Sequence, residues 1–348
     1  MYYNHFGLSQ PPFRITPNTE FFYSGGNRGP ILEALIYAIE QGEGIIKVTG
    51  EVGSGKTMLC TMLQARLPAN VETIYIANPS VSPEEIVHAV ALELQLKPPR
   101  DAGHLEVMQA LHHHLLERHA QGKQVVMFVE ESQSMPIATL EEIRLLSNLE
   151  TAQSKLLQIV LFGQPELDDN LSEPRIRQLR ERITHSFRLS PLKHDEIRDY
   201  LNFRLRAAGY RGPDLFSPAV VRAIAQASAG LTRRINLIAD KALLAAFSEN
   251  THTLKLKHVT AAVRLRIAIR GRVQQLAAER VPSRPVREDR DVAVAGRDHD
   301  RVGAGLSARA GHAPGAVFTV DPLDRRSRPH LELVVVRVAL QVPDNAVA

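Results

Sequence analysis

The sequence predicts an α/β fold with a largely parallel sheet, followed by a small domain made only of helices. Short apolar runs alternate with helix-like segments between residues 41 and 192. A glycine-rich loop, GEVGSGKT, lies between the first of these runs and the helix-like segment that follows it. Beyond residue 193 the chain shows helical spacing only. Such alternation is typical of a parallel sheet with helices on both faces.

The elements of the first half follow this alternation in order. Ser82 and Pro83, followed by Glu85, form a helix-start signal, with Ser as N-cap, Pro at the first helical position and Glu completing a capping box. The β-branched and apolar runs predict strands, and the i, i+3, i+4 spacing predicts helices. The predicted strands are 45–50, 72–78 and 125–132, and the predicted helices are 31–42, 56–67, 83–96 and 105–122.

The second half supplies the last two predicted strands of the sheet and then the helices of the last domain. A helix at 139–150 separates strand 125–132 from a strand at 156–163, and 184–192 supplies a fifth strand. Ser217 followed by Pro218 marks the start of a helix in the last domain. The helices predicted for that domain are 194–209, 217–230, 232–249 and 257–269.

We therefore expect four regions in the chain. Residues 1–40 form a lead-in segment rich in aromatic residues and proline, 41–192 the α/β domain, and 193–270 the helical lid domain. Residues 271–348 contain twelve Arg but no Lys, Ile, Met, Tyr or Cys, and their spacing predicts no fold. Two interpretations of this tail stay open: a disordered segment, or an out-of-frame extension from a GC-rich gene.

Composition bounds the location and the partners. With 348 residues, 44% hydrophobic and 23% charged, the chain resembles ordinary globular proteins, and no window reaches the roughly 18 apolar residues of a membrane span. The first residues lack an export signal, so we expect a cytoplasmic protein, compatible with peripheral attachment at the inner membrane. A net charge of +4 permits nucleic-acid binding but does not favour it.

The glycine-rich loop carries the clearest chemistry. Glycines 50, 53 and 55 allow tight turns that point backbone N–H groups at phosphate oxygens. Lys56 is expected to reach the β- and γ-phosphates, and the Thr57 hydroxyl to ligate Mg²⁺. The cofactors we expect are therefore ATP and Mg²⁺. The predicted nucleotide-binding residues here are Gly50, Glu51, Val52, Gly53, Ser54, Gly55, Lys56, Thr57 and Met58.

Hydrolysis also requires acidic groups on a neighbouring strand. Glu130 and Glu131 end the apolar run VVMFV, where a parallel sheet places its ligand crevice. We assign the metal-side role to Glu130, where an Asp is usual, and the role of general base to Glu131. The extra methylene of Glu130 could lengthen a metal contact or admit a water. Without the loop upstream, two acids that cap a turn would be the simpler interpretation.

Further polar residues follow the later strands. Gln164 comes just after the fourth strand, where it could reach the γ-phosphate or the attacking water, or serve only as a turn residue. Arg180 and Arg182, with Arg177, precede the fifth strand and could serve a neighbouring subunit, or be solvated helix residues. Arg233, next to Arg234, begins a lid helix from which a guanidinium could bend back onto the nucleotide.

The sequence resembles the AAA+ ATPases of the general secretion pathway protein A (ExeA-like) family over about residues 1 to 270, and within that family it resembles the members that serve biogenesis of the mannose-sensitive haemagglutinin (MSHA) pilus. The strings that carry the resemblance are FGLSQPPFRITPNTEFF, the glycine-rich loop, VEESQSMPIATLEEIRLLSNLET, LLQIVLFGQPELD, IRQLRERITHSF and GLTRRINLIADKALLAA. Thr232 stands where the family usually has proline.

This resemblance implies a five-stranded sheet of order 5-1-4-3-2, a helical lid, and ATP sites between the subunits of a homo-oligomer. It implies that Gln164 is sensor 1, Arg182 or Arg180 the arginine finger, and Arg233 the sensor 2 arginine. Longer ExeA-type proteins continue into a membrane span and a peptidoglycan-binding region, and neither is recognisable here. That favours the shorter pilus type, with membrane-associated pilus or secretion components as partners.

Three functions are compatible with the sequence. The first is an ATPase that drives or regulates assembly of a type IV (MSHA-like) pilus or secretion machine. The second is a DNA-associated AAA+ regulator of the transposition type. The third is an ATP-dependent scaffold with weak hydrolysis, because of Glu130. DNA affinity that falls steeply with salt would favour the second, and turnover separates the third.

Overall fold

The sheet has the strand order that the resemblance implies. The computed structural model of the chain describes residues 2–99 and 102–265. Its five strands lie in the order β2-β3-β4-β1-β5, and every neighbouring pair is parallel. The strands are β1 Ile45–Gly50, β2 Val71–Ile76, β3 Gln124–Val129, β4 Leu157–Gly163 and β5 Ile183–Leu189. All five carboxyl ends therefore point to one edge of the sheet, which positions the site.

Each predicted helix has a counterpart in the described residues, and two short helices were not predicted. The α-helices are α1 Arg28–Gln41, α2 Lys56–Arg66, α3 Pro83–Glu93, α4 His104–Ala120, α5 Ile137–Leu146, α6 Glu166–Ser172, α7 Arg177–Glu181, α8 His194–Ala207, α9 Pro218–Ser228 and α10 Thr232–Ser248. Residues 256–265 are also helical, whereas the last four residues of the predicted helix at 257–269 lie outside the described residues.

The capping box predicted at the start of α3 is present. The backbone N–H of Glu85 donates to the Ser82 hydroxyl at 3.2 Å, and the Glu85 carboxylate accepts from the Ser82 N–H at 2.8 Å. At the start of α9, the Ser217 hydroxyl accepts from the N–H of Val220 at 3.5 Å, without the reciprocal bond of a capping box. The first backbone N–H groups of a helix have no acceptor within the helix, and each cap supplies one. The two helices therefore begin where the sequence predicts.

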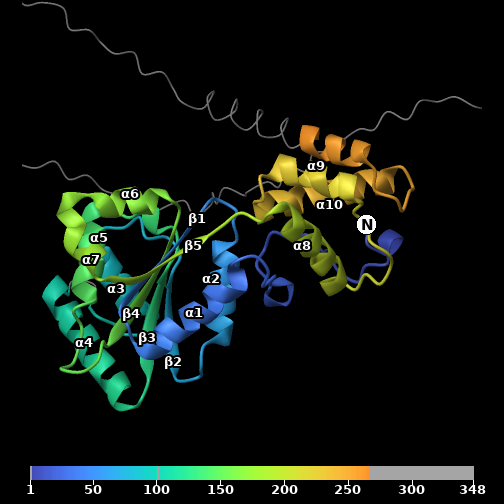
Figure 1. Cartoon of the computed structure of the whole chain (residues 1–348). Coiled ribbons are helices and arrows are strands. Elements are labelled where there is room, and N and C mark those ends of the chain that lie inside the picture. The colour runs from blue at the N-terminus through green and yellow to red at the C-terminus, as the bar shows by residue number, and fades with distance from the viewer. Residues whose placement is uncertain (1, 100–101, 266–348) are drawn as a thin grey trace, which may run out of the picture. The chain divides into compact units, whose positions relative to one another are not determined.

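The sheet separates two hydrophobic cores, because alternate side chains of a strand point to opposite faces. In β3, Val125, Met127 and Val129 pack against α3, α4, α5 and α7. Val126 and Phe128 pack against α1 and α2 instead. Figure 1 shows these helices on the two sides of the sheet. The apolar run of β3 is continuous because both of its faces are buried.

The lead-in segment joins two different cores. Its first part, which includes Tyr2, Phe6 and Phe13, packs into the core formed by α8, α9 and α10. Its last part forms α1, whose Leu32 and Leu35 pack against the sheet. The aromatic residues at the start of the chain are thus core residues of the lid, and the segment is tied to both domains.

The structure differs from the sequence expectations chiefly where strands end. β3 stops at Val129 rather than at residue 132, because Glu131 has a left-handed backbone with φ of 50° and the chain turns into a 3₁₀ helix at Ser132–Ser134. Helices α6 and α7 have seven and five residues, which is too short for a periodic apolar pattern to be read. In the described residues, no helix is long and apolar enough to cross a membrane. The predicted tail, 271–348, lies outside the described residues.

Candidate active site

The glycine-rich loop connects β1 to α2 at the carboxyl edge of the sheet. Gly53 and Gly55 have φ of 81° and 107°, a region that favours glycine. A Cβ at Gly53 would also lie 2.8 Å from Cβ of Arg233, so space excludes larger residues here as well. α2 begins at Lys56, and its free N–H groups and dipole therefore face the loop. The loop therefore has the geometry of an anion-binding site.

The Lys56 side chain lies against this loop. Its ammonium donates to the carbonyl oxygens of Gly50 at 2.7 Å and Glu51 at 3.3 Å, and the residue is buried. Burial lowers the pKa of Lys56, against the opposing pull of Glu131 and Glu130. A buried cation held only by carbonyl groups and nearby carboxylates suits an anionic ligand, which supplies stronger acceptors.

The side chains of Thr57 and Glu130 meet at the carboxyl edge of the sheet. The Thr57 hydroxyl donates to Oε2 of Glu130 at 3.0 Å. Oε1 of Glu130 is buried and has no hydrogen-bond partner among the described residues. Burial raises the pKa of the Glu130 carboxyl, the Thr57 hydrogen bond opposes this, and the net shift is upward. One hydroxyl and one carboxylate with a buried, unsatisfied oxygen are the hard oxygen donors that Mg²⁺ prefers, so the donor set fits this ion.

Glu131 is held by two glutamine side chains. Its Oε2 accepts from Nε2 of Gln133 at 2.7 Å and from Nε2 of Gln164 at 3.0 Å. Oε1 of Gln133 in turn accepts from the backbone N–H of Gln164 at 2.9 Å. Burial would raise the pKa of Glu131, but the two amides and Lys56 together lower it. The carboxylate is therefore ionised near neutral pH, with Oε1 left for another donor.

Gln133 was missed in the sequence, because no local pattern in the string ESQS indicates its contact with Glu131. The 3₁₀ turn after Glu131 returns the chain so that residues 131 and 133 point the same way. The backbone carbonyl of Gln133 also accepts from Nδ2 of Asn170 on α6, at 3.0 Å. An unusual backbone conformation at Glu131 is what brings the two side chains together, and propensity rules do not foresee it.

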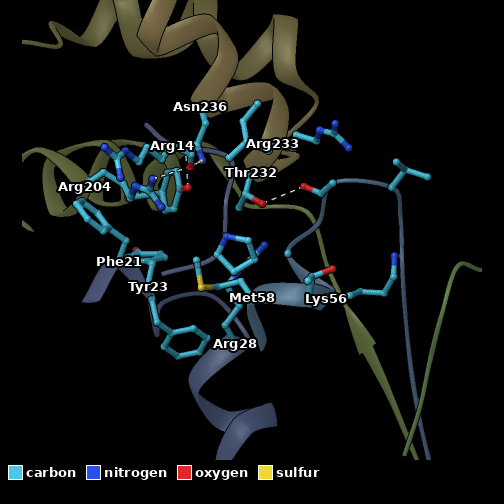
Figure 2. A pocket seen from close by; sticks show the side chains of 18 of the residues that line it. Arg14, Phe21, Tyr23, Arg28, Lys56, Met58, Arg204, Thr232, Arg233 and Asn236 are labelled. Atoms are coloured by element: carbon cyan, nitrogen blue, oxygen red, sulfur yellow. Dashed lines mark hydrogen bonds between the residues drawn. The ribbon is translucent and has the colours of Figure 1, made fainter. Parts of the chain in front are cut away.

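The lid contacts the loop directly. The Thr232 hydroxyl donates to the Gly53 carbonyl at 2.9 Å, and the N–H of Arg233 donates to the same oxygen at 3.0 Å. Figure 2 shows Thr232 and Arg233 above Lys56, with the hydrogen bond of the Thr232 hydroxyl drawn as a dashed line. The Thr232 hydroxyl bond is one that proline could not make. The Arg233 side chain is exposed and lines the same cavity as Lys56.

These groups surround a cavity of about 250 Å³. The cavity is lined by the loop with Lys56 and Thr57, by Glu131, and by side chains of the lead-in segment and of the lid. Figure 2 shows Lys56 on one side and Phe21 and Arg204 on the other. The lead-in residues of the wall are Arg14, Ile15, Pro17, Phe21, Phe22, Tyr23 and Arg28. None of them was predicted as a site residue. What the sequence offered as an indication of this wall was the run of aromatic residues and prolines within residues 1–40.

Two predicted site residues lie elsewhere. Arg180 is exposed on α7, and neither it nor Arg182 lines the cavity. Arg182 donates to the Ser147 hydroxyl at 3.2 Å and lies at the amino end of β5, whereas the loop lies at the carboxyl ends of the strands. Within one chain, neither arginine contacts the glycine-rich loop.

Comparison with known proteins agrees with this geometry. A family model described as an AAA domain matches residues 39–171. General secretion pathway protein A of Aeromonas hydrophila is 42% identical over 254 residues, which cover 73% of this chain and 46% of that protein. The chain thus spans about half the length of this curated relative.

Solved structures show the same fold at low sequence identity. The ORC2 protein of Aeropyrum pernix, solved with ADPNP and ADP, is 18% identical with a TM-score of 0.57, covering 74% of this chain and 71% of that one. Cdc6p of Pyrobaculum aerophilum is 18% identical with a TM-score of 0.56, covering 71% and 70%. A Walker-type ATPase of Pyrococcus abyssi is 14% identical with a TM-score of 0.52, covering 77% and 80%. The chain thus has the P-loop fold of an AAA domain followed by a helical domain, and over 254 residues it is similar to general secretion pathway protein A.

Proposed function

We propose that this chain binds ATP with Mg²⁺ in the cavity and hydrolyses it. The observation that carries the proposal is the convergence of Lys56, the Thr57–Glu130 pair and Glu131 on one loop. Lys56 and the backbone N–H groups of the loop bind the phosphates, and Arg233 approaches them from the lid. The apolar and aromatic wall from the lead-in segment receives the base.

Thr57 and Glu130 are the residues that would hold Mg²⁺, which neutralises phosphate charge when bound. Glu131 orients a water through its free Oε1 and takes its proton, while Gln133 and Gln164 keep the carboxylate ionised and aimed. We propose Gln164 as sensor 1, supported by its hydrogen bond to Glu131, and Arg182 or Arg180 would complete the site of the next subunit.

Two measurements on one set of variants test this proposal. Lys56→Met should raise the Kd for MANT-ATP by about 100-fold or more and abolish phosphate release, because a buried cation paired to the phosphates is removed. Lys123→Met is the matched control: Lys123 is exposed in the turn before β3 and makes no side-chain hydrogen bond within the described residues. Unchanged binding in Lys56→Met would refute the site.

We further propose that hydrolysis serves assembly of a secretion machine or of an MSHA-like pilus, by a homo-oligomer at the inner membrane. Support comes from the 42% identity to general secretion pathway protein A and from the strings shared with that family. A host strain whose chromosomal copy carries Lys56→Met should lose surface pili or secreted protein, whereas a Lys123→Met strain should not. Normal pili and secretion in the Lys56→Met strain would contradict this role.

A further inference from the structure

Arg28, at the first position of α1, is a buried cation whose hydrogen bonds go to backbone carbonyls. Its relative exposure is 5%. Nη2 donates to the Ser54 carbonyl at 3.0 Å and to the Ser190 carbonyl at 3.3 Å. No carboxylate of the described residues lies within ion-pair distance of it. A buried guanidinium without such a partner calls for an explanation, because isolated buried charges are costly.

The two carbonyls belong to different parts of the site. Ser54 is inside the glycine-rich loop, and Ser190 is the first residue after β5, on the way to the lid. Asn27 strengthens the second attachment, since its Nδ2 donates to the Arg188 carbonyl at 2.7 Å. Arg28 thereby links the loop, the end of β5 and the lead-in segment at one point.

The bond to Ser54 fixes the direction of a neighbouring amide. A trans peptide is planar, so the carbonyl of Ser54 and the N–H of Gly55 point in opposite directions. Arg28 draws the Ser54 carbonyl toward α1, which leaves the Gly55 N–H facing away from Arg28. Gly55, with φ of 107°, is otherwise free to let this peptide rotate. Without Arg28, neither the Ser54 carbonyl nor the Gly55 N–H would be held in this direction.

The positive charge of Arg28 also favours an anion in the cavity. Burial lowers the pKa of its guanidinium, while Tyr200, Glu196 and Tyr23 oppose that shift only in part. Arg28 lines the cavity together with Lys56, and Figure 2 shows it below Met58 and beside Tyr23. An anion in the cavity would compensate both buried cations, and water-poor surroundings strengthen this attraction.

We propose that Arg28 is a positioning residue of the nucleotide site: it holds the Ser54–Gly55 peptide with its N–H toward the phosphates and supplies positive charge at the wall of the cavity. This inference rests on the proposed nucleotide site but adds a residue outside every motif of the sequence. It predicts that Arg28 matters for the affinity of phosphate-bearing nucleotides more than for folding.

The test compares MANT-ADP binding and ligand-free thermal unfolding in four proteins: the wild type, Arg28→Met, Arg28→Lys and the control Arg222→Met. Arg222 is exposed on α9 and makes no side-chain hydrogen bond within the described residues. Arg28→Met should raise the Kd about tenfold or more, and Arg28→Lys should fall between it and the wild type, because lysine keeps the charge but cannot span both carbonyls. Arg222→Met should bind as the wild type does.

A Kd for Arg28→Met within about twofold of the wild type would overturn the inference, as would a lysine variant that binds no more tightly than the methionine variant. If Arg28→Met does not fold, Arg28→Lys decides: affinity about threefold or more below the wild type supports the role, and unchanged affinity refutes it. Lys56→Met, measured alongside, separates the two claims. If Lys56→Met loses binding while Arg28→Met keeps it, only the role of Arg28 fails; if the wild type binds no nucleotide, the proposed function fails.

Discussion

The Thr57 hydroxyl donates a hydrogen bond to Oε2 of Glu130 at 3.0 Å, although their strands are not neighbours in the sheet. Thr57 follows β1 and Glu130 follows β3, with β4 between them. The extra methylene of Glu130, compared with the usual Asp, helps the carboxylate to span this distance. The structure therefore brings together the two side chains that we propose as ligands of Mg²⁺.

Replacing Glu130 with Gln should stabilise the ligand-free protein at neutral pH. Burial raises the pKa of Glu130 in the folded state above its ordinary value of 4.5. In the window between that value and the raised pKa, the folded state binds the proton more tightly, so the free energy of unfolding falls as pH rises. Glutamine avoids the buried charge. The Tm of Glu130→Gln should exceed that of the wild type at pH 7, with a smaller difference near pH 4.5.

The same variant should need more Mg²⁺. In phosphate-release assays, Glu130→Gln should shift the Mg²⁺ concentration for half-maximal rate upward about tenfold or more, since an anionic oxygen donor is lost. Glu106→Gln, an exposed glutamate on α4, is the control for both measurements. A Mg²⁺ dependence equal to that of the wild type would remove Glu130 from the metal site.

Gln133→Met should reduce kcat while leaving nucleotide affinity nearly unchanged. Methionine keeps the length of the side chain but cannot donate to Glu131 or accept from Gln164. We expect kcat to fall about tenfold or more, because orientation of the base affects only the chemical step. Steady-state kinetics with a parallel ATP Kd measures this. Gln153→Met, in an exposed turn, is the control, and an equal loss of kcat there would point to a nonspecific effect.

Arg182→Ala should abolish turnover in a way that a second subunit can repair. An arginine that stabilises the transition state from a neighbouring chain is worth about 10³- to 10⁵-fold in rate. Arg182→Ala keeps its own loop, and Lys56→Met keeps Arg182, so mixing the two inactive proteins should restore part of the phosphate release. Each protein alone is the baseline. If mixing gives only the sum of the two baselines, the arginine does not act between subunits.

Phe128→Ala should destabilise the α/β domain by about 3–5 kcal/mol, because a fully buried aromatic side chain leaves a cavity. Phe128 lies on the α1–α2 face of β3, with its ring 6.4 Å from that of Phe162. Chemical denaturation measures the change. Phe22→Ala, at a partly buried position, should cost clearly less, and equal costs would mean that the core is not centred on β3.

How far the sequence predicts this structure depends on the range of the interactions. Strand β1 and the start of α2 follow from local pattern and glycine spacing, and both match at the residue. The bonds from Thr232 to Gly53 and from Arg28 to Ser54 join residues 179 and 26 positions apart, so no local pattern indicates them. Gln133 is close to Glu131 in sequence, but the two side chains meet because the Glu131 backbone is left-handed, and the sequence does not predict that conformation.

The central claim is that Glu131 activates water for ATP hydrolysis at this loop, and Glu131→Gln tests it most directly. The amide keeps the shape of the side chain but cannot take a proton. Phosphate release should be measured at saturating MgATP, together with the amount of MANT-ATP bound. We expect a rate at least about 100-fold below that of the wild type, with ATP binding unchanged. Phosphate release at the wild-type rate, from a variant that binds ATP normally, would contradict it.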